Sequence, residues 1–183
     1  FTEIELAILT GPPGLIGGLF FSPSEEVAYR FARSIRSMGR KQAPAVHPRV
    51  LEFFDSRSLE LLKAKHPGIP AGSGGAIYFE QECSKVEPGF LEKRWRAVAK
   101  SLGAADHCWL FRDPKGQQFL RKFRYDLPVL VNQAAARNGF RKIGTDMAVP
   151  ESTGAAMFDF YLKKLRGCRM DYALFGHVGQ EHL

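Results

Sequence analysis

The hydrophobic and polar positions of the chain change their period along the sequence, and each change predicts an element of secondary structure. Residues 2–9 alternate polar and apolar side chains, which is the period of a half-buried strand, and residues 15–21 form an apolar run typical of a buried strand. By the same criteria we expect strands at 50–54, 76–82, 108–112, 140–149 and 170–175, and helices at 22–39, 56–65, 90–102, 115–138 and 152–166.

The first and the last of these helices have the clearest boundaries. The first opens on Ser22-Pro23-Ser24-Glu25-Glu26, which offers a capping hydroxyl, a proline suited to a first turn and two carboxylates at the positive end of the helix dipole. In the last helix, Ser152 is the expected cap and Gly167 the expected stop. Each helix carries one apolar face, formed by Val27, Ala28, Phe31, Ala32, Ile35 and Met38 in the first and by Met157, Phe158, Tyr161, Leu162 and Leu165 in the last.

The order of these elements defines the fold class. Strands and helices are interspersed, and several strands alternate polar and apolar side chains instead of being apolar throughout, which favours an antiparallel sheet with helices on one face. We therefore expect a single α+β domain over residues 1–183, with a large antiparallel sheet covered by helices and built from ferredoxin-like halves.

Composition narrows the classes of protein further. The chain has 183 residues, with 26 Lys and Arg against 19 Asp and Glu, and its densest basic stretch, residues 30–41, has the spacing of a solvated helix face. We expect no nucleic acid partner, because no basic stripe with interleaved aromatic residues is visible. No apolar run approaches the roughly 20 residues of a membrane span, and we expect no signal peptide, because no charged segment followed by an apolar one precedes the first strand. Three separated cysteines predict free thiols and a cytoplasmic protein.

Common nucleotide, zinc and hydrolase motifs are missing from the sequence. It contains no G-x-x-x-x-G-K-[ST] loop, no C-x-x-C pair and no G-x-S-x-G elbow. The glycines at 11–18 lead into a second strand, so no helix follows to receive a phosphate, and the glycines at 72–75 precede a strand as well. Both segments predict turns.

The last eleven residues carry the most informative pattern. A strand runs into Gly176-His177-Val178-Gly179, where the glycines allow a backbone or a ligand to approach an imidazole closely. His182 follows His177 by five positions with Glu181 between them, so the segment either contributes metal ligands or ends in a frayed terminus.

This segment, residues 176–183, resembles the Gly-His-x-Gly-x-x-Asn/His-Leu-His signature of the FAD-linked oxidase C-terminal domain, found in D-lactate dehydrogenase, glycolate oxidase large subunit and D-2-hydroxyglutarate dehydrogenase flavoproteins. Residues 144–150 look like the family's Asp-x-Ala/Ser-x-Pro segment, and residues 50–55 are similar to its strand with the pattern leucine, glutamate, two apolar residues and aspartate. Residues 1–6 look like the strand that ends the family's FAD-binding domain, so the resemblance spans nearly the whole chain.

The resemblance implies that the chain is the substrate or cap domain of a longer flavoprotein, truncated at both ends. FAD would bind mainly to an N-terminal domain of the same protein, with His182 as the cofactor-binding candidate here. His177 is the candidate catalytic residue, and also the candidate ligand of a divalent metal such as zinc. The family's metal-binding members use two histidines seven positions apart, and the chain ends before the second of these.

Two basic residues are implied to bind the substrate. Arg124 resembles the family's arginine that pairs with the substrate carboxylate, and a guanidinium is suited to that role because it forms two parallel hydrogen bonds. Arg121 and Lys122 compete with it. Some relatives place a lysine where this chain has Gly144, and Lys142 would lie on the same face of an alternating strand as Gly144.

The function implied is FAD-dependent oxidation of a small anionic D-2-hydroxy acid by hydride transfer to flavin, with the isolated chain inactive. The first alternative is a stand-alone ferredoxin-like binding or assembly module without catalytic activity. The second is a quinone-linked respiratory enzyme that rests on the inner membrane face, with residues 30–49 against anionic lipid.

Overall fold

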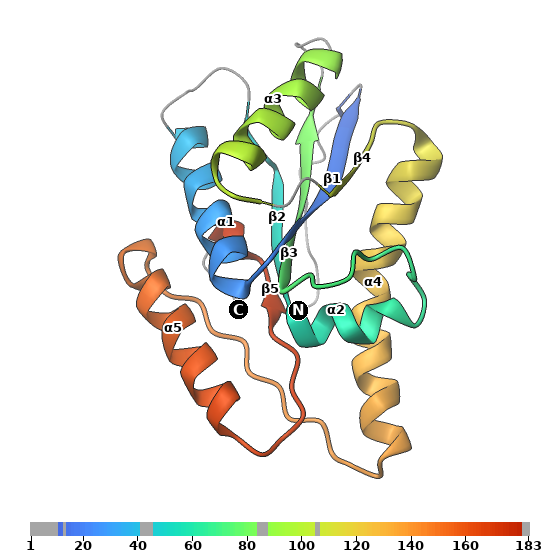
Figure 1. The fold of residues 1–183 in the computed structure, drawn as a ribbon, viewed down its shortest axis with the longest axis vertical. Coiled ribbons are helices and arrows are strands. Elements are labelled where there is room, and N and C mark those ends of the chain that lie inside the picture. Colours follow the sequence, from blue (N-terminus) through green and yellow to red (C-terminus); the bar gives the residue numbers. More distant parts are fainter. Residues whose placement is uncertain (1–10, 13, 41–45, 84–87, 105–106, 181–183) are drawn as a thin grey trace, which may run out of the picture.

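The computed structural model describes residues 11–12, 14–40, 46–83, 88–104 and 107–180, so the strand expected at 2–9 lies outside the described residues. The strands follow one another across a single antiparallel sheet in the order β4-β1-β3-β2-β5 (Figure 1). The strands are β1 Leu15–Ser22, β2 Val50–Asp55, β3 Gly75–Glu82, β4 Cys108–Phe111 and β5 Phe175–Gly176. The helices are α1 Glu25–Arg40, α2 Ser56–Lys63, α3 Pro88–Ser101, α4 Pro114–Arg137 and α5 Glu151–Gly167, with a 3-10 turn, η1, at Val178–Gln180.

The first four strands form one ferredoxin-like unit, which confirms the α+β fold. The unit follows the order β1-α1-β2-β3-α3-β4, and its strands lie as β4-β1-β3-β2. An additional helix, α2, lies between β2 and β3. The remainder of the described chain, expected as a second half, contributes α4, α5 and the short strand β5 at the free edge of β2.

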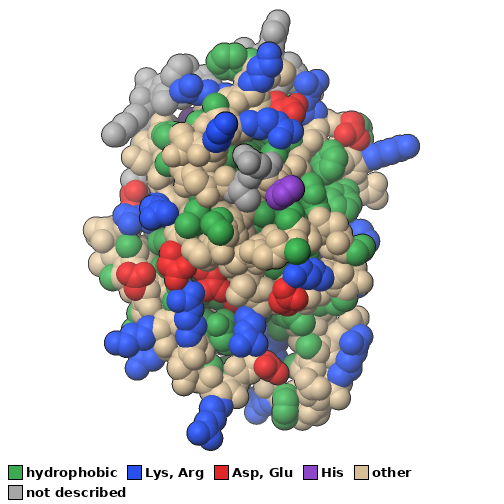
Figure 2. Space-filling view, in the orientation of Figure 1, with side chains coloured by type: hydrophobic (Ala, Val, Ile, Leu, Met, Phe, Trp, Pro, Cys, Tyr) green, Lys and Arg blue, Asp and Glu red, His purple; other side chains and the backbone are tan. Residues whose placement is uncertain are grey.

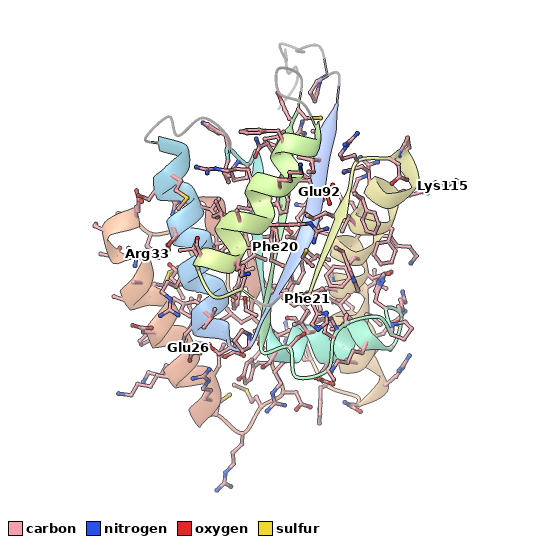
Figure 3. All side chains as sticks on the ribbon, turned by 45° about the horizontal axis from the view of Figure 1, so that its top comes forward. Phe20, Phe21, Glu26, Arg33, Glu92 and Lys115 are labelled. Carbon is pink, nitrogen blue, oxygen red and sulfur yellow. The ribbon has the colours of Figure 1, made fainter. Side chains whose placement is uncertain are left out.

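Helices cover both faces of the sheet, whereas the alternating strands predicted helices on one face. Successive residues of a strand point to opposite faces, so Phe20 belongs to a core with α1, α3 and α5, and Phe21 to a second core with α2 and α4 (Figure 3). Phe20 stacks on Phe79 and Trp95 with ring centroids 5.5 and 5.9 Å apart. The second face of the sheet is therefore mostly apolar, and it is buried under α2 and α4.

Three of the expected elements after α4 differ in the structure. Residues 141–148 are exposed and make only an isolated bridge at Ala148, because an alternating segment becomes a strand only where a neighbouring strand pairs with it. The strand expected at 170–175 shortens to β5, which pairs with β2 only at Phe53 and Phe54. Helix α5 begins after Pro150, so Ser152 lies inside its first turn and does not cap it.

Gly18 of β1 lies so close to the neighbouring strand β4 that a larger side chain does not fit. A Cβ atom there would lie 2.5 Å from both the Trp109 carbonyl oxygen and Leu110 Cδ2 of β4, and backbone cannot move aside cheaply. We expect Gly18→Ala to lower the free energy of unfolding by about 1–3 kcal/mol, measured by urea denaturation. Gly89→Ala is the matched control: nothing lies within 4 Å of its added methyl in α3, so it should stabilise by up to about 1 kcal/mol. Equal effects of the two substitutions would contradict the close β1–β4 contact.

Asp55 caps α2 from a fully buried position. Its Oδ1 accepts a hydrogen bond from Ser58 N at 2.8 Å, while Oδ2 has no hydrogen-bond partner among the described residues. Burial raises the pKa of Asp55 from 3.8 to about 6, against the hydrogen bonds from Ser58, which lower it. The folded chain therefore holds this proton more tightly than the unfolded chain, and stability is lost as pH rises from about 4 through 6.

We expect Asp55→Asn to stabilise the protein relative to wild type at about pH 7.5, by roughly 3 kcal/mol at most, and to lose about two thirds of this advantage at about pH 4.5. Asparagine keeps the cap acceptor, so the difference reports the buried charge. Urea denaturation at both pH values measures it. Asp113→Asn, at the exposed cap of α4, is the matched control. A pH-independent difference for Asp55→Asn would overturn this assignment.

Candidate active site

Three polar side chains from distant parts of the sequence meet at the edge of the second core. They are Glu52 of β2, Arg124 of α4 and His177, the residue after β5. Arg124 Nε donates a hydrogen bond to Glu52 Oε2 at 2.8 Å, and Arg124 Nη2 lies 2.5 Å from Oε1. His177 Nδ1 lies 3.0 Å from the same Oε1. One carboxylate therefore contacts both a guanidinium and an imidazole.

The sheet register delivers His177 to Glu52. Strand β5 pairs with β2 so that Gly176 lies opposite Phe53, and the next antiparallel pair brings His177 opposite Glu52. Directly opposed side chains lie about 5 Å apart at Cβ, which is close enough for contact. Glu52 shares its face of β2 with Phe54, whose ring packs edge-on against Phe123 of α4 with centroids 5.6 Å apart. The site therefore lies between the sheet and α4.

Asp126, two residues after Arg124 on α4, is the centre of an ion network that holds this part of the helix in place. The Asp126 carboxylate accepts hydrogen bonds from Lys65 at 3.0 Å and Lys122 at 2.8 Å, and His66 Nε2 lies 2.9 Å away. Burial raises the pKa of Asp126, but these three partners outweigh burial and bring the pKa down to about 2. Asp126 stays ionised at neutral pH and anchors α4 to the segment after α2.

Arg124 remains able to bind a second anion. The contacts with Glu52 use its side-on edge, Nε and Nη2, and among the described residues Nη1 has no hydrogen-bond partner. Burial lowers the pKa of Arg124, but the Glu52 charge outweighs burial and raises it. A guanidinium has five donors, so the end-on pair of nitrogens can still meet a carboxylate. The side chain is 24% exposed, which leaves it open to a ligand.

Tyr78 and Glu80 of β3 lie on the same face of the sheet as Glu52 and form a separate pair outside this group. Tyr78 lies opposite Glu52 in the β2–β3 register, is fully buried, and donates its hydroxyl hydrogen to Glu80. Burial and the hydrogen bond to Glu80 raise the pKa of Tyr78, so it stays protonated at neutral pH. Glu80 also pairs with Arg49 at 3.7 Å, which gives this carboxylate its own cation. Glu52 and Glu80 thus belong to two adjacent ion pairs.

The structure brings together two of the predicted site residues. Arg124 and His177 share Glu52, whereas Lys142 donates to Asn132 at 3.2 Å, eight residues and roughly 12 Å along α4 from Arg124. The expected strand face shared by Lys142 and Gly144 does not exist, because the segment is outside the sheet. A role for Lys142 in substrate binding stays a prediction, and His182 lies outside the described residues.

Two cofactor expectations can be tested against these residues. No group of three or more His, Cys, Asp or Glu side chains that could hold a metal ion occurs in the described part of the chain, so zinc finds no support there. Of the potential ligands, His177 and Glu52 converge, but Arg124 already neutralises Glu52. The helix N-termini of α1 and α2 carry carboxylates of the chain itself, Glu25 and Asp55, so they do not fit the FAD pyrophosphate.

Glu52 is the site residue that the sequence pattern did not assign. It has two signals in the sequence: a carboxylate inside the apolar run Val50 to Phe54, where an unpaired charge is costly, and the family-like strand pattern of residues 50–55. A carboxylate at that position implies a cationic or hydrogen-bonding partner. The sequence does not identify this partner, because spacing along the chain gives no information on which helix crosses the strand.

Charged side chains are spread over the surface without forming one basic stripe on the face shown in Figure 2, where acidic groups lie among the lysines and arginines. Arg33 is exposed on α1, as the helix-face interpretation predicts (Figure 3). No helix within the described ranges is long and apolar enough to cross a membrane.

The fold and the site together define an α+β domain that presents an arginine and a histidine, tied by one carboxylate, beside its central sheet. The chain belongs to the family of FAD linked oxidases, C-terminal domain, whose sequence profile matches residues 18–183. This match confirms the family resemblance and makes the chain a domain of an FAD-linked oxidoreductase. No curated protein matches the chain.

Proposed function

We propose that this chain is the substrate-binding cap of an FAD-dependent enzyme that oxidises a D-2-hydroxy acid of the lactate, glycolate or 2-hydroxyglutarate type. The observation that carries the proposal is the meeting of Arg124 and His177 at Glu52. A 2-hydroxy acid has a carboxylate and a hydroxyl on neighbouring carbons, so it needs a cation and a proton acceptor close together. Arg124 and His177 supply this pair.

Arg124 binds the substrate carboxylate in this proposal. Its side-on edge is occupied by Glu52, so the end-on nitrogens Nη1 and Nη2 donate two parallel hydrogen bonds to the substrate carboxylate. When no substrate is bound, Glu52 balances the charge of the Arg124 guanidinium. The bound carboxylate then places a second negative charge beside the guanidinium, on the side that Glu52 does not occupy.

His177 accepts the hydroxyl proton in this proposal. Its Nδ1 faces Glu52, which leaves Nε2 as the nitrogen that can take the proton while the α-carbon loses a hydride. The imidazole is 50% exposed, so a substrate reaches it from solvent. When bound, FAD supplies the acceptor of the two electrons, and the substrate becomes a 2-oxo acid.

The FAD-binding domain of the same protein is the partner that this function requires. Exposed apolar side chains lie along α4 and the segment that follows it, which supports a surface covered by another domain. These residues are Tyr125, Val129, Phe140, Ile143 and Met147. We expect the isolated chain to be inactive for lack of a flavin site. No disulfide joins Cys83, Cys108 or Cys168 within the described residues, which supports a cytoplasmic location.

Anaerobic reduction of the flavin tests this proposal. The full-length protein that contains this domain is purified, its FAD absorbance is recorded, and D-lactate, glycolate and D-2-hydroxyglutarate are added in turn. Bleaching by one of them is expected, and the effective substrate identifies the class. A folded protein that binds no FAD, or a flavin that none of the three acids reduces, would overturn the proposal and favour a binding module or another substrate class.

A further inference from the structure

We propose that Glu52 is a positioning residue that fixes both the tautomer of His177 and the orientation of Arg124. This inference rests on the proposed function for its kinetic consequences, but its structural consequence can be measured without substrate. In this proposal Glu52 acts on the substrate through the two side chains that it contacts, Arg124 and His177.

The burial of Glu52 is the first observation that supports this role. Glu52 is 7% exposed, and a carboxylate at such a position is retained only where its charge is compensated. Its Oε2 accepts a well-aligned hydrogen bond from Arg124. Within the described part of the chain Oε1 has no aligned donor, although Arg124 Nη2 and His177 Nδ1 lie 2.5 and 3.0 Å away. Catalytic hydrogen bonds are often misaligned without substrate and tighten when it binds. The Oε1 atom therefore has the donors it needs within reach.

The contact with Nδ1 determines which nitrogen of His177 is available. A carboxylate next to Nδ1 favours the tautomer that carries its hydrogen there, and the lone pair then lies on Nε2, on the opposite side of the ring. The same arrangement orients the histidine of hydrolase triads, where a carboxylate at Nδ1 holds the ring for proton transfer at Nε2. Glu52 thus gives the imidazole the form that accepts a proton from a hydroxyl.

The contact with Arg124 determines which edge of the guanidinium is available. Because Glu52 takes Nε and Nη2 side-on, it prevents the long side chain from rotating and leaves the end-on edge for a ligand. Without this partner, Arg124 would sample several rotamers, and ordering them on binding would weaken the affinity for a carboxylate.

Glu80 provides a matched control for a merely structural role. It is also 7% exposed, lies on the same face of the sheet, and has its own tyrosine and arginine partners, Tyr78 and Arg49. No described contact joins it to Arg124 or His177. Glu52→Gln and Glu80→Gln remove the same charge from comparable buried positions, so their difference isolates the contacts of Glu52.

The test uses the FAD-loaded full-length protein in both variants. Two-bond proton–nitrogen NMR correlations of the imidazole rings report the tautomer of His177, and His177→Gln assigns its signals. Titration with the 2-oxo acid product, followed by the flavin spectrum, gives the Kd. We expect Glu52→Gln to shift the His177 tautomer towards the Nε2–H form, to weaken product binding roughly 10- to 100-fold and to lower kcat by a similar factor. Glu80→Gln should leave all three close to wild type.

Two results would overturn the role of Glu52. One is an unchanged His177 tautomer in a folded Glu52→Gln protein, and the other is an equal loss of product binding in both variants. If Glu52→Gln does not fold, Glu52→Asp shortens the side chain by one methylene and is measured in the same way, with a smaller shift of the tautomer expected. If no hydroxy acid reduces the flavin, the proposed function fails, but the tautomer measurement still decides whether Glu52 positions His177.

Discussion

Replacing Arg124 with Met is expected to reduce kcat/KM for the hydroxy acid by about 10²- to 10⁴-fold. Two charge-assisted hydrogen bonds to the substrate carboxylate are lost, each worth roughly 1.5–3 kcal/mol. The same change leaves the Glu52 carboxylate buried without its cation, which should lower the free energy of unfolding by about 3–5 kcal/mol. Steady-state kinetics and urea denaturation of the full-length protein measure the two effects.

A double variant separates these two consequences. In Arg124→Met/Glu52→Gln, no unpaired charge remains, so most of the lost stability should return while kcat/KM stays low. If the double variant regained activity together with stability, the loss in Arg124→Met would be a folding defect, and Arg124 would not bind the substrate.

Replacing His177 with Gln is expected to lower the rate of flavin reduction by about 10²- to 10⁴-fold, the usual contribution of a positioned general base. The KM should change little, because Arg124 still binds the carboxylate. Stability should stay within about 0.5 kcal/mol, since the side chain is half exposed. Anaerobic stopped-flow spectroscopy of the flavin measures this rate.

His107→Gln is the matched control for this prediction. His107 is also exposed. Its backbone carbonyl accepts a hydrogen bond from Phe21 N of β1, which the substitution does not alter. The rate should therefore stay at the wild-type value. Equal rates in His177→Gln and His107→Gln would exclude His177 as the base.

The sequence predicted most of the ferredoxin-like unit because its local signals agree with its tertiary structure. Helix α1 has acidic residues in its first turn and one continuous apolar face, and β1 is an apolar run buried on both sides. Where a strand depends on a neighbour, the local signal was insufficient. Residues 140–149 alternate like a strand, but 141–148 stay exposed, and β5 is only as long as its pairing with β2. Pairing is a tertiary property that periodicity does not contain.

The residues of the site were also predictable only in part from the sequence. Arg124 and His177 were identified from a family resemblance, and the structure brings them to one carboxylate. The carboxylate itself was not assigned, because Glu52 and Arg124 lie 72 residues apart and meet only when α4 packs on the sheet. Lys142 was placed by extending a strand that does not form. Contacts across a core follow from the packing of elements, and sequence spacing does not give them.

The structure of the FAD-loaded protein with its 2-oxo acid product bound tests the central claim most directly. The account predicts the product carboxylate within hydrogen-bonding distance of Arg124 Nη1 and Nη2, with the keto oxygen next to His177 Nε2 and Glu52 still paired with Arg124 Nε. A product bound with its carboxylate on another cation, and with Arg124 and His177 remote from it, would contradict the account.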